Sequence, residues 1–298
     1  MREQEVSCME EEQCRLAADR SGLTEFCRTK DFLVCVDSDG CVMNTMESKH
    51  KKCFGPCLVE EWGLEHIRDA VLQRWNEINL YTVTRGVNRF VGLTKMLREV
   101  NEEYVPVAGL PALEDWVGTT PQLSEEALAV AAGSGAKILS KALAWSRKVN
   151  ERVARLSAED RQPFSAVYAS LEKTHEYADI AVVSSANEEA VREEFEESGL
   201  LGHVDLLLTQ TVGTKEYCLK ALLKKGYASS AVIMIGDARG DLKAAEKNGV
   251  LFYPILVKKE EESWRQWSEE ALLSFLNHNY SGSDQDERIE AFYRNLGM

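Results

Sequence analysis

Short apolar runs alternate with amphipathic stretches in the second half of the chain. Five runs rich in valine, isoleucine and leucine have the length of strands: residues 32–36, 180–183, 204–208, 232–235 and 251–257. Uninterrupted apolar character over such short runs is typical of parallel strands that are covered on both faces. Helical patterns separate the last four runs. The alternation therefore predicts an α/β fold with a doubly wound parallel sheet.

The segments between these runs also carry signals for where helices begin and end. Asn187 can cap a helix over residues 188–197, and the helical pattern of residues 215–225 stops at Gly226. A third helical pattern covers residues 241–247 and also stops before a glycine. Toward the C-terminus, the sequence predicts a helix over residues 263–276, a polar turn and a last helix.

The first run is separated from the second by more than 140 residues with almost no strand signal. Helical patterns fill this interval, at about 57–79, 86–101, 122–156 and 157–175. Three prolines indicate a loop between the second and third of these helices: Pro106, Pro111 and Pro121. The sequence thus predicts an α/β core domain of residues 1–44 and 179–298, with an all-helical domain of residues 45–178 inserted after the first strand.

Charge and hydropathy narrow the classes of partner. The chain of 298 residues has a net charge of −14, which disfavours a nucleic-acid partner because phosphate backbones would be repelled. No apolar run approaches the ~18–20 residues that a membrane helix needs. Residues 1–14 lack the basic and then apolar pattern of an export signal. We therefore expect a soluble, cytoplasmic protein without a membrane partner, and the sequence leaves its oligomeric state open.

Seven of the eight cysteines fall within residues 1–57. Without an export signal, a disulfide framework is not expected. His50, Cys53 and Cys57 offer three zinc ligands, but a structural zinc site requires four. The spacing of Cys53 and Cys57 places both on one face of a helix, where free cysteine behaves as a small apolar side chain. We therefore interpret these two cysteines as core residues.

The residues that directly follow the predicted strands, or open the next helix, are the candidates for a ligand site. In a doubly wound sheet, ligands bind beyond the carboxyl ends of the strands. The side chains expected at that edge are four carboxylates, a hydroxyl and an ammonium group: Asp37, Asp39, Ser184, Lys215, Asp237 and Asp241. Repulsion among so many carboxylates raises the free energy of the folded state unless a cation neutralises their charge. A ligand set of oxygens without thiolates or paired histidines indicates Mg²⁺.

These residues resemble the four motifs of the haloacid dehalogenase superfamily of phosphotransferases. The motifs are an Asp-x-Asp-Gly loop after a strand, a Ser or Thr that ends a strand, a Lys, and Gly-Asp-x-x-x-Asp. All four occur here in order. The resemblance implies a Rossmann-like core with a helical cap of the C1 type. There are three departures. Cys41 stands where the family usually has Thr or Val, and the Lys-Pro-x-Pro form of the third motif is replaced by Lys215-Glu216-Tyr217. Asn44-Thr45 stands where an acidic residue and a Ser or Thr often begin the cap linker.

The chemistry and the resemblance assign a role to each motif residue. A carboxylate can attack a phosphoryl group, and Asp37 at the strand end fits this role. Asp39, two residues on, would act as the acid and base. The resemblance implies that Ser184 and Lys215 hold phosphoryl oxygens and that the metal is held by Asp37, the backbone carbonyl of Asp39, Asp237 and Asp241. Alternatives remain open: Ser185 could replace Ser184, Lys220 could replace Lys215, and Asp241 could be only a helix cap.

The predicted insert contains a second group of candidates. Arg85 and Arg89 lie in a segment that opens a helix, and this segment is similar to a cap loop of beta-phosphoglucomutases that contacts a sugar phosphate. His50 lies one residue from the position of a cap-linker histidine in those enzymes. The alternative is that the two arginines are ordinary surface charges. The tryptophans of the insert are expected in its core: Trp62, Trp75, Trp116 and Trp145.

Three functions are compatible with these patterns. The leading hypothesis is a Mg²⁺-dependent phosphatase that hydrolyses the phosphomonoester of a small metabolite through an aspartyl-phosphate. The second is a sugar phosphomutase that uses the same site. The third is a non-catalytic binding or regulatory protein, although such relatives usually lose one of the carboxylates that are present here.

Overall fold

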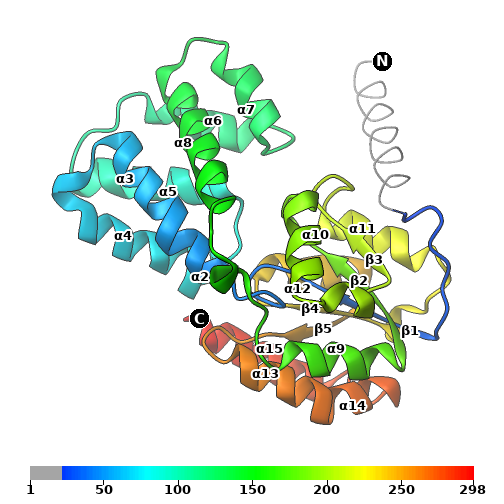
Figure 1. Cartoon of the computed structure of the whole chain (residues 1–298). Helices are drawn as coiled ribbons and strands as arrows, with labels where there is room; N and C mark the ends of the chain where they lie inside the picture. Colours follow the sequence, from blue (N-terminus) through cyan, green and yellow to red (C-terminus); the bar gives the residue numbers. More distant parts are fainter. Residues whose placement is uncertain (1–21) are drawn as a thin grey trace. The chain divides into compact units, whose positions relative to one another are not determined.

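The α/β part of the chain contains one five-stranded sheet (Figure 1). The computed structural model describes residues 22–298. The sequence also predicts a charged, partly helical lead-in over residues 1–30, and most of it lies outside the described residues. All strands are parallel and their order is β3-β2-β1-β4-β5. The strands are β1 (Phe32–Val36), β2 (Ala178–Val183), β3 (Leu206–Leu208), β4 (Val232–Gly236) and β5 (Leu251–Pro254). The predicted fold class, a doubly wound parallel sheet with an inserted helical domain, is confirmed.

The described chain divides into two compact units. The core unit contains residues 22–45 and 161–298, and the helical unit contains residues 46–160. Residues 161–178, which the sequence predicts to be part of the insert, lie in the core unit. Helix α9 (Val167–His175) belongs to the core unit because its apolar face, including Val167 and Leu171, packs in the same cluster as the central strands.

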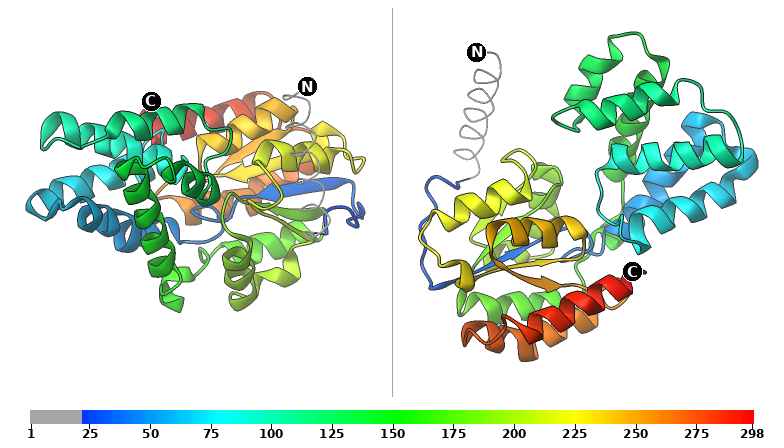
Figure 2. Two further views of the ribbon diagram at one scale, coloured as in Figure 1. Left: turned by 90° about the horizontal axis from the view of Figure 1, so that it is seen from above. Right: turned by 180° about the vertical axis from the view of Figure 1, so that it is seen from behind.

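Helices cover both faces of the sheet, as strands that are apolar apart from Asp179 of β2 require. Side chains of α9 and α10 pack with those of the C-terminal helices against Val34, Ile180 and Ile233. Figures 1 and 2 show α11 and α12 on the opposite face. The helices that follow α9 are α10 (Glu188–Glu197), α11 (Lys215–Leu223), α12 (Arg239–Asn248), α13 (Glu260–Gln266), α14 (Leu272–Leu276) and α15 (Ser283–Asn295).

The helical unit has its own apolar core. Trp75, Trp116 and Trp145 are buried in it and Trp62 packs at its edge, which confirms the prediction for the tryptophans. Cys53 and Cys57 are also buried there as core residues. The main helices are α2 (Met46–Ser48), α3 (Gly55–Trp62), α4 (Arg68–Asn76), α5 (Arg89–Glu103), α6 (Leu110–Thr119), α7 (Glu125–Ala132) and α8 (Lys137–Val153). Within residues 22–298, no helix is both long and apolar enough to cross a membrane.

Several predicted helices of the insert are shorter in the structure. The pattern over 57–79 is divided after α3 by Gly63, whose φ of 67° ends the helix in the left-handed conformation. The pattern over 122–156 is divided between α7 and α8 by a segment with two glycines, although Gly133, which caps α7, keeps the right-handed conformation. The loop predicted around Pro111 contains α6, because Pro111 stands in the first turn, where a missing N–H costs nothing.

The two chain segments that connect the units are joined by backbone hydrogen bonds on the core side. Asn44 N donates to Gln162 O at 2.9 Å, and Phe164 N donates to Val42 O at 3.1 Å. Met43 and Pro163 form an antiparallel bridge between these two bonds. The chain therefore leaves the core unit and returns to it at adjacent positions.

Asp179 ties the segment before β1 to the sheet. Its fully buried carboxylate accepts hydrogen bonds from the backbone N–H groups of Thr29 and Lys30, both at 3.0 Å, and from the hydroxyls of Thr29 and Tyr227. Burial alone would raise the pKa of Asp179, but these hydrogen bonds outweigh burial and hold the pKa below its usual value. The ionised form is therefore the one that stabilises the fold.

We expect Asp179→Asn to lower the free energy of unfolding by about 2–4 kcal/mol at pH 7, because an amide cannot accept all of these hydrogen bonds. Because the folded pKa is depressed, the contribution of Asp179 is complete above the unfolded pKa of about 3.9 and is lost as the pH falls through the folded value. Urea unfolding between pH 3 and 7 measures both effects. Asp31→Asn is the control, since Asp31 is exposed; equal losses in the two variants would contradict the assignment.

Candidate active site

The loop after β1 is shaped by its backbone. Asp37 N donates to Ile235 O of β4 at 3.0 Å, which extends the sheet by one residue. The Ser38 carbonyl then accepts the N–H groups of three later residues, Cys41, Val42 and Met43. Gly40 has a φ of 81°, in the left-handed region that favours glycine. The Asp-Ser-Asp-Gly sequence therefore makes a tight turn that fixes Asp37 at the carboxyl end of the central strand.

Asp37 is held through both of its carboxylate oxygens. Oδ1 accepts the N–H of Ser38 at 2.8 Å, and Oδ2 lies 2.6 Å from Nζ of Lys215. Lys215 is the first residue of α11, which Thr214 caps by accepting the N–H of Tyr217. Of the two lysines considered in the sequence, Lys215 therefore lies at the site, whereas Lys220 is exposed on the same helix.

Asp241 is the second anion on Lys215. Its Oδ1 lies 2.5 Å from Lys215 Nζ, and its Oδ2 accepts the N–H of Ala238 at 3.0 Å at the start of α12. It is thus a helix cap and a member of the charged cluster at once. Gly236 makes room for it: a Cβ on Gly236 would lie 2.4 Å from the Asp241 carboxylate. The Gly-Asp-x-x-x-Asp spacing is explained by this close approach.

Asp237 completes a group of three buried carboxylates. One oxygen from each of Asp37, Asp237 and Asp241 lies within 4.8 Å of the other two. With Lys215 as the single cation of this group, two negative charges are in excess. A divalent cation would balance them, and a donor set of carboxylate oxygens suits Mg²⁺. The residues present therefore fit the metal that the sequence predicts.

The pKa values reflect the shortage of positive charge. Burial raises the pKa of Asp37 to about 6, although the Lys215 ammonium opposes this shift. Burial likewise raises the pKa of Asp241 to about 6, again against the effect of Lys215. For Lys215 itself, burial would lower the pKa, but the charges of Asp241 and Asp37 outweigh it and raise the pKa above its usual value. Lys215 is thus a permanent cation, while the carboxylates still require a further positive charge.

Asp39 lies outside this three-carboxylate group. Its half-buried carboxylate accepts the hydroxyl of Thr45, which is fully buried at the end of the same loop. The sequence predicts the backbone carbonyl of Asp39 at the metal and its carboxylate as the acid and base, and it gives no chemical role to Thr45. The available signal was a hydroxyl residue six positions after Asp39, but only the folded loop brings the two side chains together.

Ser184 lies at the same edge of the sheet. Val182 of β2 pairs with Val36 of β1, so Ser184 follows β2 level with the Asp37 loop. Its N–H donates to Leu208 O at 2.8 Å, and its Oγ accepts the N–H of Ala186 at 3.1 Å. Ser184 is buried and Ser185 is exposed. The fixed position of Ser184 favours it as the candidate phosphate ligand.

The three candidates from the insert have structural contacts within the helical unit. His50 Nδ1 accepts the indole N–H of Trp75 at 3.1 Å, and its ring stacks on Phe54 at 4.7 Å. Arg85 is only 3% exposed and donates to Leu80 O at 2.8 Å.

Arg89 also contacts other residues of the helical unit. Its Nη1 donates to Asn150 Oδ1 at 2.7 Å and to Ser146 Oγ at 3.2 Å, and its guanidinium lies over the Phe54 ring at 5.1 Å. These contacts account for the presence of His50, Arg85 and Arg89 without a ligand. Their proposed role in substrate binding rests on the sequence alone.

We expect Gly236→Ala to destabilise the core unit by about 1–3 kcal/mol, because the added methyl group must displace the Asp241 carboxylate. The displaced carboxylate should also weaken the stabilisation that added Mg²⁺ gives by binding the folded state. Thermal unfolding with and without Mg²⁺ measures both effects. Gly240→Ala is the control, since a Cβ there meets no atom within 4 Å. The same behaviour in both variants would show that Gly236 is not needed to seat Asp241.

Comparison with known proteins agrees with the motifs. The model of the haloacid dehalogenase-like hydrolase family matches residues 114–255, a range that includes Ser184, Lys215, Asp237 and Asp241. This match confirms the resemblance to the haloacid dehalogenase superfamily that the sequence analysis identified. No curated protein matches the chain.

Several solved structures are similar at low sequence identity. A haloacid dehalogenase-like family hydrolase from Xanthomonas campestris has a TM-score of 0.47 and 12% identity, with 85% of this chain and 96% of that chain covered. A predicted phosphoglycolate phosphatase from Haemophilus somnus has a TM-score of 0.45 and 14% identity, covering 76% and 85%. A haloacid dehalogenase-like hydrolase from Streptococcus pneumoniae has a TM-score of 0.44 and 15% identity, covering 88% and 98%.

Proposed function

We propose that this chain is a Mg²⁺-dependent phosphatase that hydrolyses the phosphomonoester of a small metabolite, with Asp37 as the nucleophile. The observation that carries the proposal is the seating of Asp37 between the Ser38 N–H and the Lys215 ammonium, next to two further buried carboxylates. This arrangement keeps an anionic side chain buried beside two others, with one ammonium of the chain in contact. It is the arrangement expected for a nucleophile whose target is an anion.

The proposed metal ligands are the carboxylates of Asp37, Asp237 and Asp241, with Asp39 contributing through its backbone carbonyl as the motif implies. Bound Mg²⁺ would supply the positive charge that this group lacks and would neutralise the phosphoryl oxygens of the substrate. Lys215 and Ser184 would bind other phosphoryl oxygens, the first as a fixed ammonium and the second through its hydroxyl.

The reaction proceeds in two displacements. In the first, an oxygen of Asp37 forms a bond to phosphorus as the bond to the alcohol oxygen breaks, and Asp39 gives that oxygen its proton. In the second, water attacks the phosphorus of the aspartyl-phosphate and Asp39 takes the proton from the water, which releases phosphate and regenerates Asp37. With a pKa of about 6, Asp37 is mostly ionised at neutral pH, as a nucleophile must be.

Thr45 fits this scheme as a positioning residue. Its buried hydroxyl donates to the Asp39 carboxylate and fixes the orientation of a group that changes its protonation state twice in each turnover. A side chain with that task needs a partner which tolerates both states. A hydroxyl can donate to the carboxylate or accept from the acid, so it meets this requirement.

A phosphomutase remains the second candidate from sequence, but no observation on residues 22–298 favours it over a hydrolase. The side chains that suggested it, His50, Arg85 and Arg89, have contacts within the core of the helical unit. A small phosphorylated metabolite is the substrate class that suits an acidic chain with a net charge of −14, because a large polyanion would be repelled.

The test of the proposed function is release of phosphate from an aryl phosphate. We expect turnover with Mg²⁺, none with a chelator, and a loss of about 10⁴-fold or more in Asp37→Asn, which cannot form the intermediate. Asp31→Asn, an exposed Asp→Asn change, should retain activity and controls for the substitution. Turnover in the chelator, or in Asp37→Asn, would exclude this mechanism. A folded, metal-binding protein that releases no phosphate would point to the binding or regulatory class.

Asp39→Asn should separate the two displacements. An aryl phosphate has a leaving group that needs no proton, so the first step should continue and the aspartyl-phosphate should accumulate. An alkyl phosphate does need the proton, so its turnover should fall by about 10²–10⁴-fold. Rapid-quench measurement of acid-stable phosphoprotein and of released phosphate distinguishes the steps. Equal losses on both substrates without a trapped intermediate would remove Asp39 from the acid and base role.

A further inference from the structure

A buried hydrogen bond joins the loop after β1 to the C-terminal part of the chain. The indole Nε1 of Trp264 donates to the backbone carbonyl of Cys41 at 2.8 Å. Cys41 lies four residues after Asp37, whereas Trp264 belongs to α13 and lies outside the four motifs. Both side chains are fully buried. A residue 223 positions away therefore contacts the loop that carries the proposed nucleophile.

The same loop is fastened to β4 at both ends of its turn. Asp37 N donates to Ile235 O at 3.0 Å, and Cys41 Sγ donates to the same carbonyl at 3.6 Å. Cys41 is thus bound to β4 through its side chain and to α13 through its carbonyl. Because the turn from Asp37 to Cys41 is short, fixing Cys41 in this way also restricts the positions of Asp37 and Asp39.

The position of Trp264 is fixed by neighbouring elements. Its carbonyl accepts the hydroxyl of Ser170 in α9 at 3.1 Å. The preceding residue, Ser263, accepts the hydroxyl of Tyr253 in β5 at 2.7 Å through its carbonyl and the N–H of Leu256 at 3.1 Å through its Oγ. The Trp264 side chain also packs in the apolar cluster of the central strands. A donor with such support can hold its acceptor in one place.

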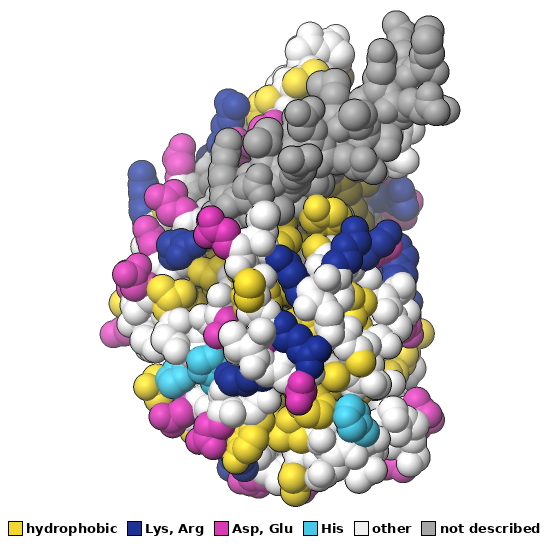
Figure 3. Space-filling view, turned by 90° about the vertical axis from the view of Figure 1, so that its right-hand side faces the viewer, with side chains coloured by type: hydrophobic (Ala, Val, Ile, Leu, Met, Phe, Trp, Pro, Cys, Tyr) yellow, Lys and Arg dark blue, Asp and Glu magenta, His cyan; other side chains and the backbone are white. Residues whose placement is uncertain are grey.

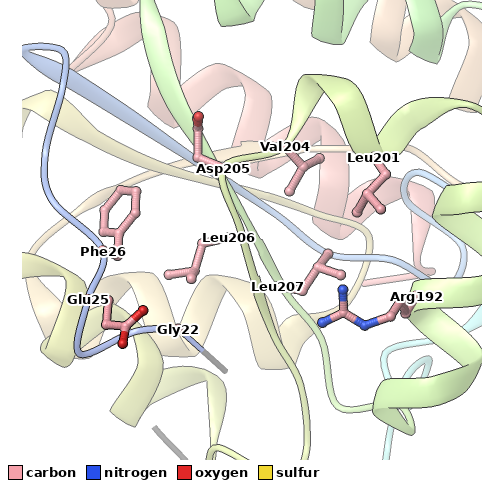
Figure 4. Close-up of a pocket in the computed structure, with 9 residues that line it drawn as sticks. All are labelled: Gly22, Glu25, Phe26, Arg192, Leu201, Val204, Asp205, Leu206 and Leu207. Atoms are coloured by element: carbon pink, nitrogen blue, oxygen red, sulfur yellow. The ribbon is translucent and has the colours of Figure 1, made fainter. Parts of the chain in front are cut away.

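The segment that precedes β1, residues 22–31, contacts the other end of the sheet, where Thr29 and Lys30 bind Asp179. Charged side chains of both signs and histidines are exposed on this side of the molecule (Figure 3). An open pocket of about 420 Å³ lies there beside β3, and its lining is partly apolar and partly charged (Figure 4). In contrast, α13 reaches the loop at the carboxyl end of β1. The segments before β1 and after β5 therefore support opposite ends of β1.

We propose that Trp264 is a positioning residue whose indole N–H keeps Asp37 and Asp39 in the geometry that the reaction requires. The inference rests on the proposed phosphatase function and adds a residue to it. Without this donor, the Cys41 carbonyl would be buried without a partner, and the turn would have to shift toward another donor. A shift of about 1 Å at a reacting group can cost about 10²-fold in rate. The backbone carbonyl of Asp39, a proposed metal ligand, lies in the same turn and would shift with it.

Trp264→Phe tests this role, with Trp267→Phe as the matched control. Trp267 is equally buried and donates its indole N–H to Thr174 Oγ1 of α9 at 2.9 Å, so it loses the same kind of bond outside the loop. Both variants should lower the melting temperature by about 2–8 °C, because each loses one buried hydrogen bond. At saturating Mg²⁺, we expect only Trp264→Phe to lower kcat for an aryl phosphate, by about tenfold or more. The KM of this variant should stay within about twofold, because Lys215 and Ser184, which would bind the phosphoryl oxygens, do not belong to the loop.

Replacement of Trp264 by 3-benzothienylalanine removes the donor and keeps the shape, since sulfur takes the place of the indole N–H. It should reproduce the loss of kcat even if Trp264→Phe does not fold. Thermal unfolding over a range of Mg²⁺ concentrations needs no turnover, and it should show Mg²⁺ binding weakened about threefold or more by the changes at Trp264 but not by Trp267→Phe.

The same kcat and the same Mg²⁺ binding in the variants at the two positions would overturn the proposal. A chain that binds Mg²⁺ but releases no phosphate would contradict the proposed function alone. The Mg²⁺ titrations would then decide whether Trp264 positions the loop: weaker binding only in the variants at Trp264 would support this role, and equal binding would exclude it.

Discussion

The shared ammonium of Lys215 is the interaction on which the candidate site depends. It lies between Asp37 and Asp241, and without it three carboxylates would be buried within a few ångströms of one another with no cation from the chain. The ammonium of Lys215 lowers the pKa of Asp37 and of Asp241, but burial outweighs it and raises each pKa to about 6. The fold thus tolerates an excess of negative charge at this site, and that excess favours the binding of a cation.

The order of the strands explains why residues far apart in sequence meet at this place. β1 and β4 are neighbours at the centre of the sheet, so Asp37 and Asp237 emerge side by side. β2 flanks β1 on the other side and brings Ser184 to the same edge. Lys215 reaches the group from the start of α11. The sheet therefore brings residues that are about 200 positions apart in the sequence to within a few ångströms of one another.

The parts that could be predicted from sequence are those in which local pattern and tertiary environment agree. Buried parallel strands are uniformly apolar, so the position of β1 and the existence of the others follow from the sequence. The insert was less predictable because α6 has a proline in its first turn, where a loop was expected, and because α9, although helical in pattern, packs with the core unit. The motif carboxylates and Lys215 were identifiable by spacing. The contact of Thr45 with Asp39 and the burial of Arg85 were not, because both depend on how the loops fold.

The bridge between residues 42–44 and 162–164 has a consequence for how this architecture can vary. Since backbone hydrogen bonds join the two segments on the core side, the core unit closes on itself whatever chain lies between them. The entropic cost of a longer excursion grows only slowly, by about 0.6 kcal/mol for each doubling of its length. Insertions and deletions can therefore accumulate in the helical unit with little effect on the sheet. The length of the helical unit is thus decoupled from the position of Asp37, because the chain segments on both sides of the insert are already fixed to each other in the core unit.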